Sequence, residues 1–198
     1  DLSNVSAGNY AITVYAPNVN CTATKFFTID EPLEALGHNG VSSNVDCFGA
    51  STGTVDLTVW GGTPPYSFSW NSGASTEDLL EIPSGGYDVE ISDSKNCTNT
   101  SSYLILQPDI IIGTMSATNV GCYGDGSGSV AIDVVGGSLP YYYSWFNSTT
   151  LFAQNAPTMV NMSAEEYQVV VTDANGCILT DSIEITQPQE LSGTVITL

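Results

Sequence analysis

The chain has 198 residues, of which 21 are acidic and only two, Lys25 and Lys95, are basic, so its formal net charge is −19. A surface of that sign repels phosphate, which excludes nucleic acid as a partner and argues against docking on anionic lipid. Apolar residues make up 42% of the chain and charged residues 12%. That balance is ample for packed cores and unlike an acidic disordered tail.

The sequence repeats itself in order. Residues 44–49 (NVDCFG) return 75 positions later as residues 119–124 (NVGCYG), and the PYSFSW segment 65–70 returns as PYYYSW at 140–145. The second half of the unit recurs as well, from Tyr87 through Cys97 to Pro108 and from Tyr167 through Cys177 to Pro188. Self-similarity at a fixed period indicates a tandem array of like domains.

A partial copy opens the chain, since Gly8, Tyr10 and Cys21 match the late half of the two full units. We therefore expect that the chain is a slice of a longer protein and that it contains four segments. They are the end of one repeat at 1–32, complete repeats at 33–108 and 109–188, and the start of another at 189–198.

Within a repeat, apolar residues alternate with polar ones, which is the pattern of half-buried strands. In the first full repeat we expect strands at 33–42, 54–60, 66–70, 86–92 and 98–106, with a variable stretch at 76–82. Short strands separated by Gly, Pro, Asn and Asp clusters predict an all-β fold of tandem immunoglobulin-like antiparallel β-sandwich repeats.

Four aromatic residues are the expected core. Trp70 and Trp145 fall on the third strand, where such sandwiches often bury a tryptophan, and Tyr87 and Tyr167 begin a late strand as a tyrosine corner does. The second repeat is five residues longer between its Trp and its Tyr, so residues 147–157 should form a surface loop or an extra strand pair.

The five cysteines occupy two positions of the repeat. Cys47 and Cys122 lie early, and Cys21, Cys97 and Cys177 lie late. The simplest pairing is within each repeat, Cys47 with Cys97 and Cys122 with Cys177, with Cys21 left unpaired by truncation. Closing a loop of about 50 residues would stabilise by roughly 4 kcal/mol. Spacing also allows a shifted register, Cys21 with Cys47 and Cys97 with Cys122. Strand order raises an objection to the first pairing, because the first turn and the last hairpin lie at opposite ends.

Catalytic and metal-binding residues are scarce. The chain has a single histidine, His38, and no Cys-x-x-Cys pair, which argues against a zinc site and against an enzyme. Glu77 and Asp78 are interpreted as a solvated loop edge. Asp93 and Asp173 precede the last hairpin and are turn residues first, with calcium at the junctions between repeats as a secondary hypothesis for a cofactor.

Aromatic residues outside the expected core offer a different hypothesis. Trp60, Tyr142, Phe146 and Tyr15 point away from the face that carries Trp70 and Trp145, and extracellular sandwiches often stack sugars on such rings. The alternative function is therefore an array of carbohydrate-binding modules in a secreted enzyme. These aromatics are not repeated between units, because Val135 stands where the first repeat has Trp60.

The ordered set of motifs resembles the SprB repeat of cell-surface gliding adhesins of Bacteroidetes. The motifs that carry it are Cys-Phe/Tyr-Gly, Gly-Gly, Pro-Tyr-x-Phe/Tyr-Ser-Trp, Tyr-x-Val, the late Cys and Gln-Pro, and they span nearly the whole chain. Departures are Lys95-Asn96 before Cys97, Leu139 in place of the usual first Pro, and Ala16 where an Asp is expected.

The resemblance implies a very long protein that is exported by the type IX system and displayed extracellularly at the bacterial cell surface. It implies a structural role as a stalk or filament segment, with surface attachment and gliding as the biological context. The implied partners are neighbouring repeats of the same chain and the gliding and secretion machinery at the outer membrane, with a surface polysaccharide as a further candidate.

Overall fold

A computed structural model describes residues 3–18, 20–152 and 155–193, and every regular element within them is a β-strand. The all-β fold class is therefore confirmed. Among the described residues no helix exists that could cross a membrane. The expected loop at 147–157 and the expected repeat start at 189–198 lie partly outside the described residues.

The strands follow one another along the chain with short connections. They are β1 Gly8–Ala16, β2 Cys21–Ile29, β3 Gly37–Ser43, β4 Gly53–Trp60, β5 Ser67–Trp70, β6 Leu79–Ile82, β7 Gly85–Ser92, β8 Thr98–Ile105, β9 Ile112–Thr118, β10 Gly128–Val135, β11 Tyr142–Phe146, β12 Leu151–Phe152, β13 Thr158–Met162, β14 Glu166–Thr172 and β15 Ile178–Glu184.

The chain divides into two compact units whose boundary crosses the strands of the first full repeat. The first unit contains Asp1–Val41, Asp56–Asp78 and Tyr87–Ser102, and the second contains Ser42–Val55, Leu79–Gly86 and Tyr103–Leu198. The second full repeat lies entirely in the second unit. The boundaries predicted at residues 33, 109 and 189 stay predictions.

Strands β1 and β2 form an antiparallel hairpin in which Gly8 pairs with Ile29 and Ala16 with Cys21. Its apolar residues are exposed: Ile12 is 52% and Val14 64% accessible. The residues at the same repeat positions in β7, Val89 and Ile91, are 2% and 0% accessible. The pattern of the sequence thus sets the strand, whereas burial requires a second sheet, which no described element supplies to this hairpin.

The first full repeat contains two three-stranded sheets, with strand orders β3-β4-β6 and β5-β7-β8. Strand β4 alternates as its sequence predicts, with Val55 and Leu57 buried and Asp56 exposed. The leading strand starts at Gly37 rather than at 33. Leu33 is fully exposed, and the carbonyl of Glu34 accepts the amide N–H of Gly62, so this segment is held by a turn rather than by a sheet ladder.

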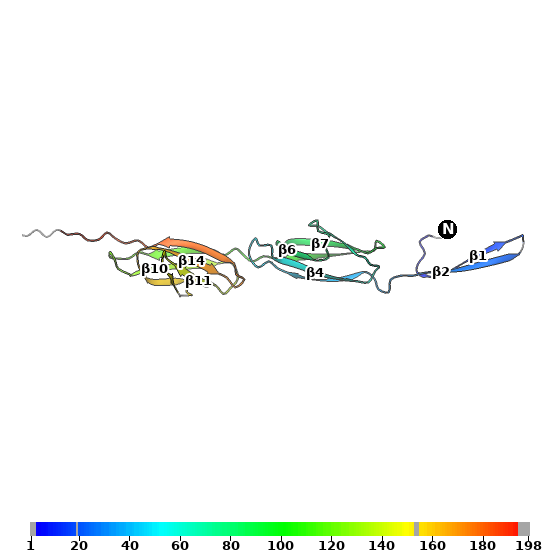
Figure 1. The fold of residues 1–198 in the computed structure, drawn as a ribbon, viewed down its shortest axis with the longest axis horizontal. Helices are drawn as coiled ribbons and strands as arrows, with labels where there is room; N and C mark the ends of the chain where they lie inside the picture. Colours follow the sequence, from blue (N-terminus) through cyan, green and yellow to red (C-terminus); the bar gives the residue numbers. More distant parts are fainter. Residues whose placement is uncertain (1–2, 19, 153–154, 194–198) are drawn as a thin grey trace, which may run out of the picture. The chain divides into compact units, whose positions relative to one another are not determined.

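The second full repeat packs a three-stranded sheet, β13-β10-β9, against a four-stranded sheet, β12-β11-β14-β15 (Figure 1). Its core is built from the inward residues of both sheets. Val130 and Ile132 come from β10, and Trp145, Val169 and Val171 come from β11 and β14. The added strand β12 pairs with the end of β11, which places an extra strand in the region where the longer connection was expected.

The aromatic residues expected in the core are buried. Trp145 is 0% and Tyr167 2% accessible. Each polar tip has a partner, as buried Trp and Tyr require. Trp145 Nε1 donates to the carbonyl of Ala156 at 2.9 Å, and the Tyr167 hydroxyl donates to the carbonyl of Ser163 at 3.1 Å. The bond from Tyr167 to a residue four positions upstream has the form of a tyrosine corner. Trp70 and Tyr87 are buried likewise.

The burial of Trp145 gives the first prediction. Trp145→Ala should lower the free energy of unfolding by about 3–5 kcal/mol, because it removes a large buried ring and leaves a cavity. Urea unfolding followed by tyrosine fluorescence measures the loss. The matched control is Tyr142→Ala on the same strand, whose side chain is 53% exposed and should cost about 1 kcal/mol or less. Equal losses in the two variants would contradict the assigned core.

Candidate functional site

A buried carboxylate organises the last hairpin of the second repeat. Asp173 is 2% accessible. Its Oδ1 accepts the amide N–H groups of Asn175 and Cys177 at 2.9 and 2.8 Å, and its Oδ2 accepts the N–H of Ser138 at 2.8 Å. One side chain therefore fixes the β14–β15 turn and ties it to the loop between β10 and β11. It also sets the position of Cys177.

Asp93 repeats this arrangement in the first full repeat. Its Oδ1 accepts the N–H groups of Lys95 and Cys97 at 2.8 and 2.9 Å, and its Oδ2 accepts the N–H of Thr63 at 2.8 Å. The amide of Cys97 is the main cause that lowers the pKa of Asp93 below its ordinary value, while burial acts in the opposite direction. Hydrogen bonds to the ionised form thus hold this carboxylate charged.

The paired glycines are the second part of the same network. Gly136 and Gly137 have φ of +79° and +60°, in the left-handed region that favours glycine. A Cβ atom on Gly137 would lie 2.7 Å from Asp173 Oδ2. The N–H of Gly137 donates to the carbonyl of Asp109 in the linker at 2.9 Å. The Tyr141 hydroxyl donates to the carbonyl of Gly136. The Gly-Gly-x-x-Pro-Tyr motif therefore joins linker, turn and hairpin.

A disulfide bond closes on this network from the preceding repeat. Cys47 is bonded to Cys177, with a Cα–Cα distance of 5.6 Å and a sequence separation of 130. Asn175 Nδ2 donates to the carbonyl of Asp46 at 3.0 Å. All of these residues belong to the second compact unit. The early cysteine of the first full repeat is thus bonded to the late cysteine of the second.

This pairing differs from both registers that the sequence suggested. Cys47 is bonded neither to Cys97 nor to Cys21, and both Cys97 and Cys122 are exposed thiols. The second repeat shows why pairing within a repeat fails. Cys177 precedes the start of β15, whereas the loop of Cys122 is held beyond its far end, where Gly124 N–H donates to Gln187 at 3.0 Å.

The length of β15 makes the separation large. Seven strand residues at about 3.3 Å each span roughly 20 Å. A disulfide needs Cα atoms within about 7 Å. The early and late cysteines of one repeat are therefore too far apart to bond, and only a cysteine from another repeat can reach either of them. The objection from strand order was the available signal in the sequence.

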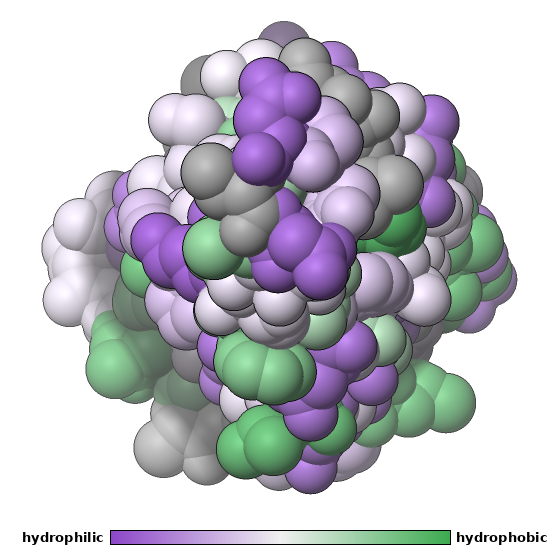
Figure 2. Space-filling model, turned by 90° about the vertical axis from the view of Figure 1, so that its right-hand side faces the viewer, coloured by the Kyte–Doolittle hydropathy of each residue, from purple (hydrophilic) through white to green (hydrophobic). Residues whose placement is uncertain are grey.

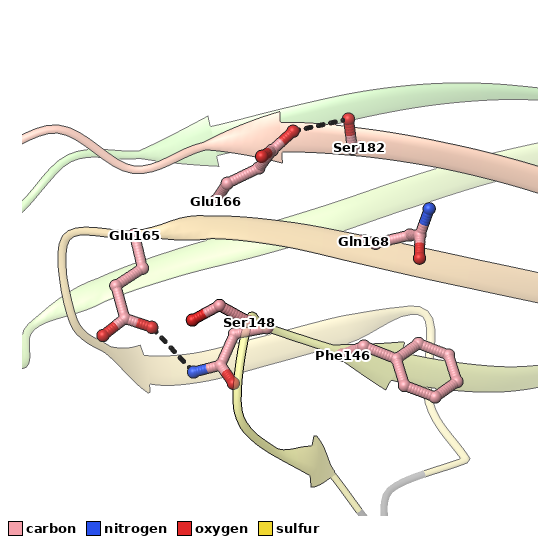
Figure 3. Close-up of a pocket in the computed structure, with 7 residues that line it drawn as sticks. Phe146, Ser148, Glu165, Glu166, Gln168 and Ser182 are labelled. Carbon is pink, nitrogen blue, oxygen red and sulfur yellow. Dashed lines mark hydrogen bonds between the residues drawn. The ribbon is translucent and has the colours of Figure 1, made fainter.

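A polar groove of about 380 Å³ lies beside the outer face of the β11-β14-β15 sheet (Figure 3). Figure 3 shows Phe146 at one side and Glu165 and Glu166 on the other. Both carboxylates are engaged: Glu165 accepts the Asn147 amide at 2.7 Å, and Glu166 accepts the Ser182 hydroxyl at 3.1 Å. The groove offers one aromatic ring, two hydrogen-bonded carboxylates and several hydroxyl and amide groups.

The non-core aromatics do not form one platform. Tyr142 and Phe146 share the outer side of β11, whereas Tyr15 and Trp60 belong to β1 and β4. Trp60 lies over Gly37, where a Cβ atom would be 2.7 Å from its Nε1. On the face drawn in Figure 2, hydrophobic residues form small groups separated by hydrophilic ones. These observations give little support to stacking of a long sugar chain.

The carboxylates of Asp93 and Asp173 are not arranged as calcium ligands. Each of their oxygens accepts a hydrogen bond from a backbone amide N–H, and a cation would be repelled by those N–H groups. Within residues 3–18, 20–152 and 155–193, no group of three or more His, Cys, Asp or Glu side chains could hold a metal ion. Calcium therefore stays a prediction from the sequence alone.

The geometry defines tandem all-β repeats of the immunoglobulin-like class, two of which are joined by the Cys47–Cys177 disulfide. The family comparison is more specific: residues 39–75 and 114–150 both match the model of the SprB repeat. Two segments of the chain thus match the SprB repeat, as its motifs indicated. The matched segments cover the front half of each repeat and end before the hairpin that carries the late cysteine. No curated protein sequence matches the chain.

Solved structures are similar only loosely. One titled for Dscam isoform specificity has 12% identity and a TM-score of 0.38, and it covers 91% of this chain. The chain spans 54% of that structure's length. Drosophila OTK extracellular domains 3–5 have 12% identity, a TM-score of 0.41 and coverage of 92% of this chain and 72% of theirs. At these scores the likeness says nothing about function.

The lowered pKa of Asp93 predicts a pH dependence. Because the folded pKa lies below the unfolded value, the carboxylate stabilises the fold above about pH 4, and the contribution is lost as pH falls through the folded pKa. Asp93→Asn should therefore lower the urea midpoint more at pH 7 than at pH 2, each compared with the parent. Asp56→Asn, at an exposed position of β4, is the control and should show no such difference. Equal losses for Asp93→Asn at both pH values would contradict the assignment.

Proposed function

We propose that the chain is a load-bearing stalk segment of a secreted adhesin, displayed on a bacterial cell surface and moved along it during gliding. The match of both repeats to the SprB family supports the adhesin context. The disulfide supports an oxidising, extracellular location, because such bonds are rare in the cytosol. The proposed partners are neighbouring repeats and the secretion and gliding machinery at the outer membrane. The proposal assigns no catalytic role.

The Cys47–Cys177 bond is the observation that carries the mechanical part of the proposal. When the two ends of the chain are pulled, tension passes from Cys47 directly to Cys177 and bypasses the residues between them. Strands β4 to β14 lie in the bypassed segment. Their hydrogen bonds are therefore relieved of load, and a covalent bond bears it instead. Such a path suits a stalk that works under tension.

The polar groove beside Phe146 does not favour a second function. Carbohydrate-binding surfaces present rings in a row, and this groove has one ring beside two carboxylates that would repel an acidic polysaccharide. A surface polysaccharide therefore stays a hypothesis from the sequence, and the alternative of a carbohydrate-binding module in a secreted enzyme has no specific contact in its favour.

Stretching the chain from its two ends tests the load path. With the disulfide intact, the fully extended chain should be shorter by roughly 450 Å than after reduction, since the 130 positions from Cys47 to Cys177 span about 3.3–3.6 Å each. Optical tweezers with and without a reductant measure the difference. Cys177→Ser should give the long extension without reductant, and Cys122→Ser should leave the parent behaviour unchanged. Equal extensions before and after reduction would refute the load path.

Location and movement need a separate experiment. Antibodies raised against residues 33–188 should label intact living cells of the source bacterium, and the labelled sites should move along the cell surface. The physical reason is that a surface filament is accessible without permeabilisation. Antibodies that have been preabsorbed with the purified chain are the control. Labelling that appears only after permeabilisation would contradict surface display, and fixed labelling would contradict a role in gliding.

A further inference from the structure

The junction closed by Cys47 and Cys177 surrounds a cavity of about 450 Å³. Three segments line it: the early cysteine with its neighbour at 47–48, the linker at 109–111, and the second repeat at 137 and 176–178. We call this arrangement the complete junction. It contains contributions from two consecutive repeats, one that supplies the early cysteine and one that supplies the late cysteine.

A second cavity, also of about 450 Å³, reproduces one part of the complete junction at Cys122. It is lined by residues 121–123 and 188–191, which occupy the repeat positions of 46–48 and 108–111. The positions equivalent to 137 and 176–178 are supplied by no described residue. This early half-site therefore has the cysteine, the aromatic Tyr123 and the linker, and it lacks the hairpin that bears a late cysteine.

A third cavity, of about 380 Å³, reproduces the other part at Cys97. It is lined by residues 31–32, 34–36, 62 and 97–98. Of these, 34–36, 62 and 97–98 are the equivalents of 109–111, 137 and 177–178. The positions of Cys47 and Phe48 have no described counterpart here. This late half-site therefore has the linker, the paired-glycine turn and the hairpin, and it lacks an early Cys-Phe/Tyr segment.

We propose that Cys97 and Cys122 are the two open ends of a staggered disulfide register, in which the early cysteine of each repeat bonds to the late cysteine of the repeat that follows. Cys122 takes the Asp-x-x-x-Cys hairpin of a further SprB repeat, and Cys97 takes the Cys-Phe/Tyr-Gly turn of one. The complete junction shows the geometry that each half-site acquires. Both cysteines are exposed thiols in the described chain.

Bond formation balances as a thiol–disulfide exchange. The Cys122 thiol and the late thiol of its partner lose two protons and two electrons to a small-molecule disulfide, which is reduced to two thiols. The new S–S bond replaces two S–H bonds, and no other group is required. The early segment needs only its backbone carbonyl to meet the hairpin, as Asp46 does with Asn175, so Gly121 at the equivalent position can do the same.

The staggered register interlocks the array. Each bond encloses the linker between two repeats, and successive bonds overlap because the early cysteine of each repeat precedes the late cysteine of the same repeat. Only residues 98–121 separate Cys97 from Cys122. Tension that enters through the disulfide at Cys97 and leaves through the disulfide at Cys122 would therefore load only this short segment of backbone. This inference concerns the covalent partner of each half-site and does not rest on display at a cell surface or on gliding.

A lengthened chain tests the early half-site. A second copy of residues 109–188 is placed directly after Pro188 and oxidised with a small-molecule disulfide. Its exposed positions carry Ala117→Ser and Thr180→Ser so that its peptides differ in mass. Non-reducing peptide mapping should find Cys122 bonded to the late cysteine of the copy, with Cys47 still bonded to Cys177. Alkylation at Cys122, present in the parent chain, should be lost.

The matched control is the same lengthened chain with Cys122→Ser, in which the late cysteine of the copy should become alkylatable while the Cys47–Cys177 bond persists. Three results would overturn the register: a Cys122–Cys177 bond within the repeat, a bond between the two cysteines of the copy, or continued alkylation of Cys122. If the copy failed to fold, the Cys47–Cys177 bond would show that the parent repeats were still folded. A second lengthened chain would then test the register at Cys97.

That second chain carries a copy of residues 33–108 between Pro32 and Leu33. The staggered register predicts that Cys97 of the original repeat bonds to the early cysteine of the copy, and that alkylation at Cys97 is lost. A bond between the early and the late cysteine of the copy would contradict it. Because the readout is a peptide mass, it is independent of the surface labelling that tests the proposed function.

Discussion

The length of the β-strands is the constraint on which the rest of this structure depends. In the second repeat, the early and late cysteines lie beyond opposite ends of strands about seven residues long, roughly 20 Å apart. A bond within the repeat is excluded by distance. The cysteines can stabilise the protein only by joining different repeats, and the Cys47–Cys177 bond does so. Closing so long a loop is worth about 5 kcal/mol in the chain-entropy estimate.

The hairpin beside that bond is fixed by hydrogen bonds. Asp173 accepts the amide N–H groups of Asn175, Cys177 and Ser138, which sets the position of Cys177. The linker is held to the same turn by the N–H of Gly137. Asp93 and Gly62 provide the same arrangement in the first repeat. The same network of hydrogen bonds therefore positions the late cysteine in both repeats, and in the second repeat that cysteine is bonded to Cys47.

The two buried aspartates are satisfied by backbone amides and not by basic side chains. The remaining acidic residues lie mainly on the surface, where they oppose association between separate molecules.

Much of the fold was determined by the sequence itself. Period-two alternation identified β4, β7 and their counterparts, and the repeated Trp and Tyr positions identified the buried Trp70, Trp145, Tyr87 and Tyr167, because local patterning sets which face of a strand is apolar. The exposed face of the β1–β2 hairpin shows that the same pattern does not fix burial. The partner of each cysteine and the role of Asp173 were decided only by the tertiary structure. Both depend on which loops lie close together in space, and the strand lengths decide this. The number of residues between two positions in the sequence does not give the distance between them in the fold.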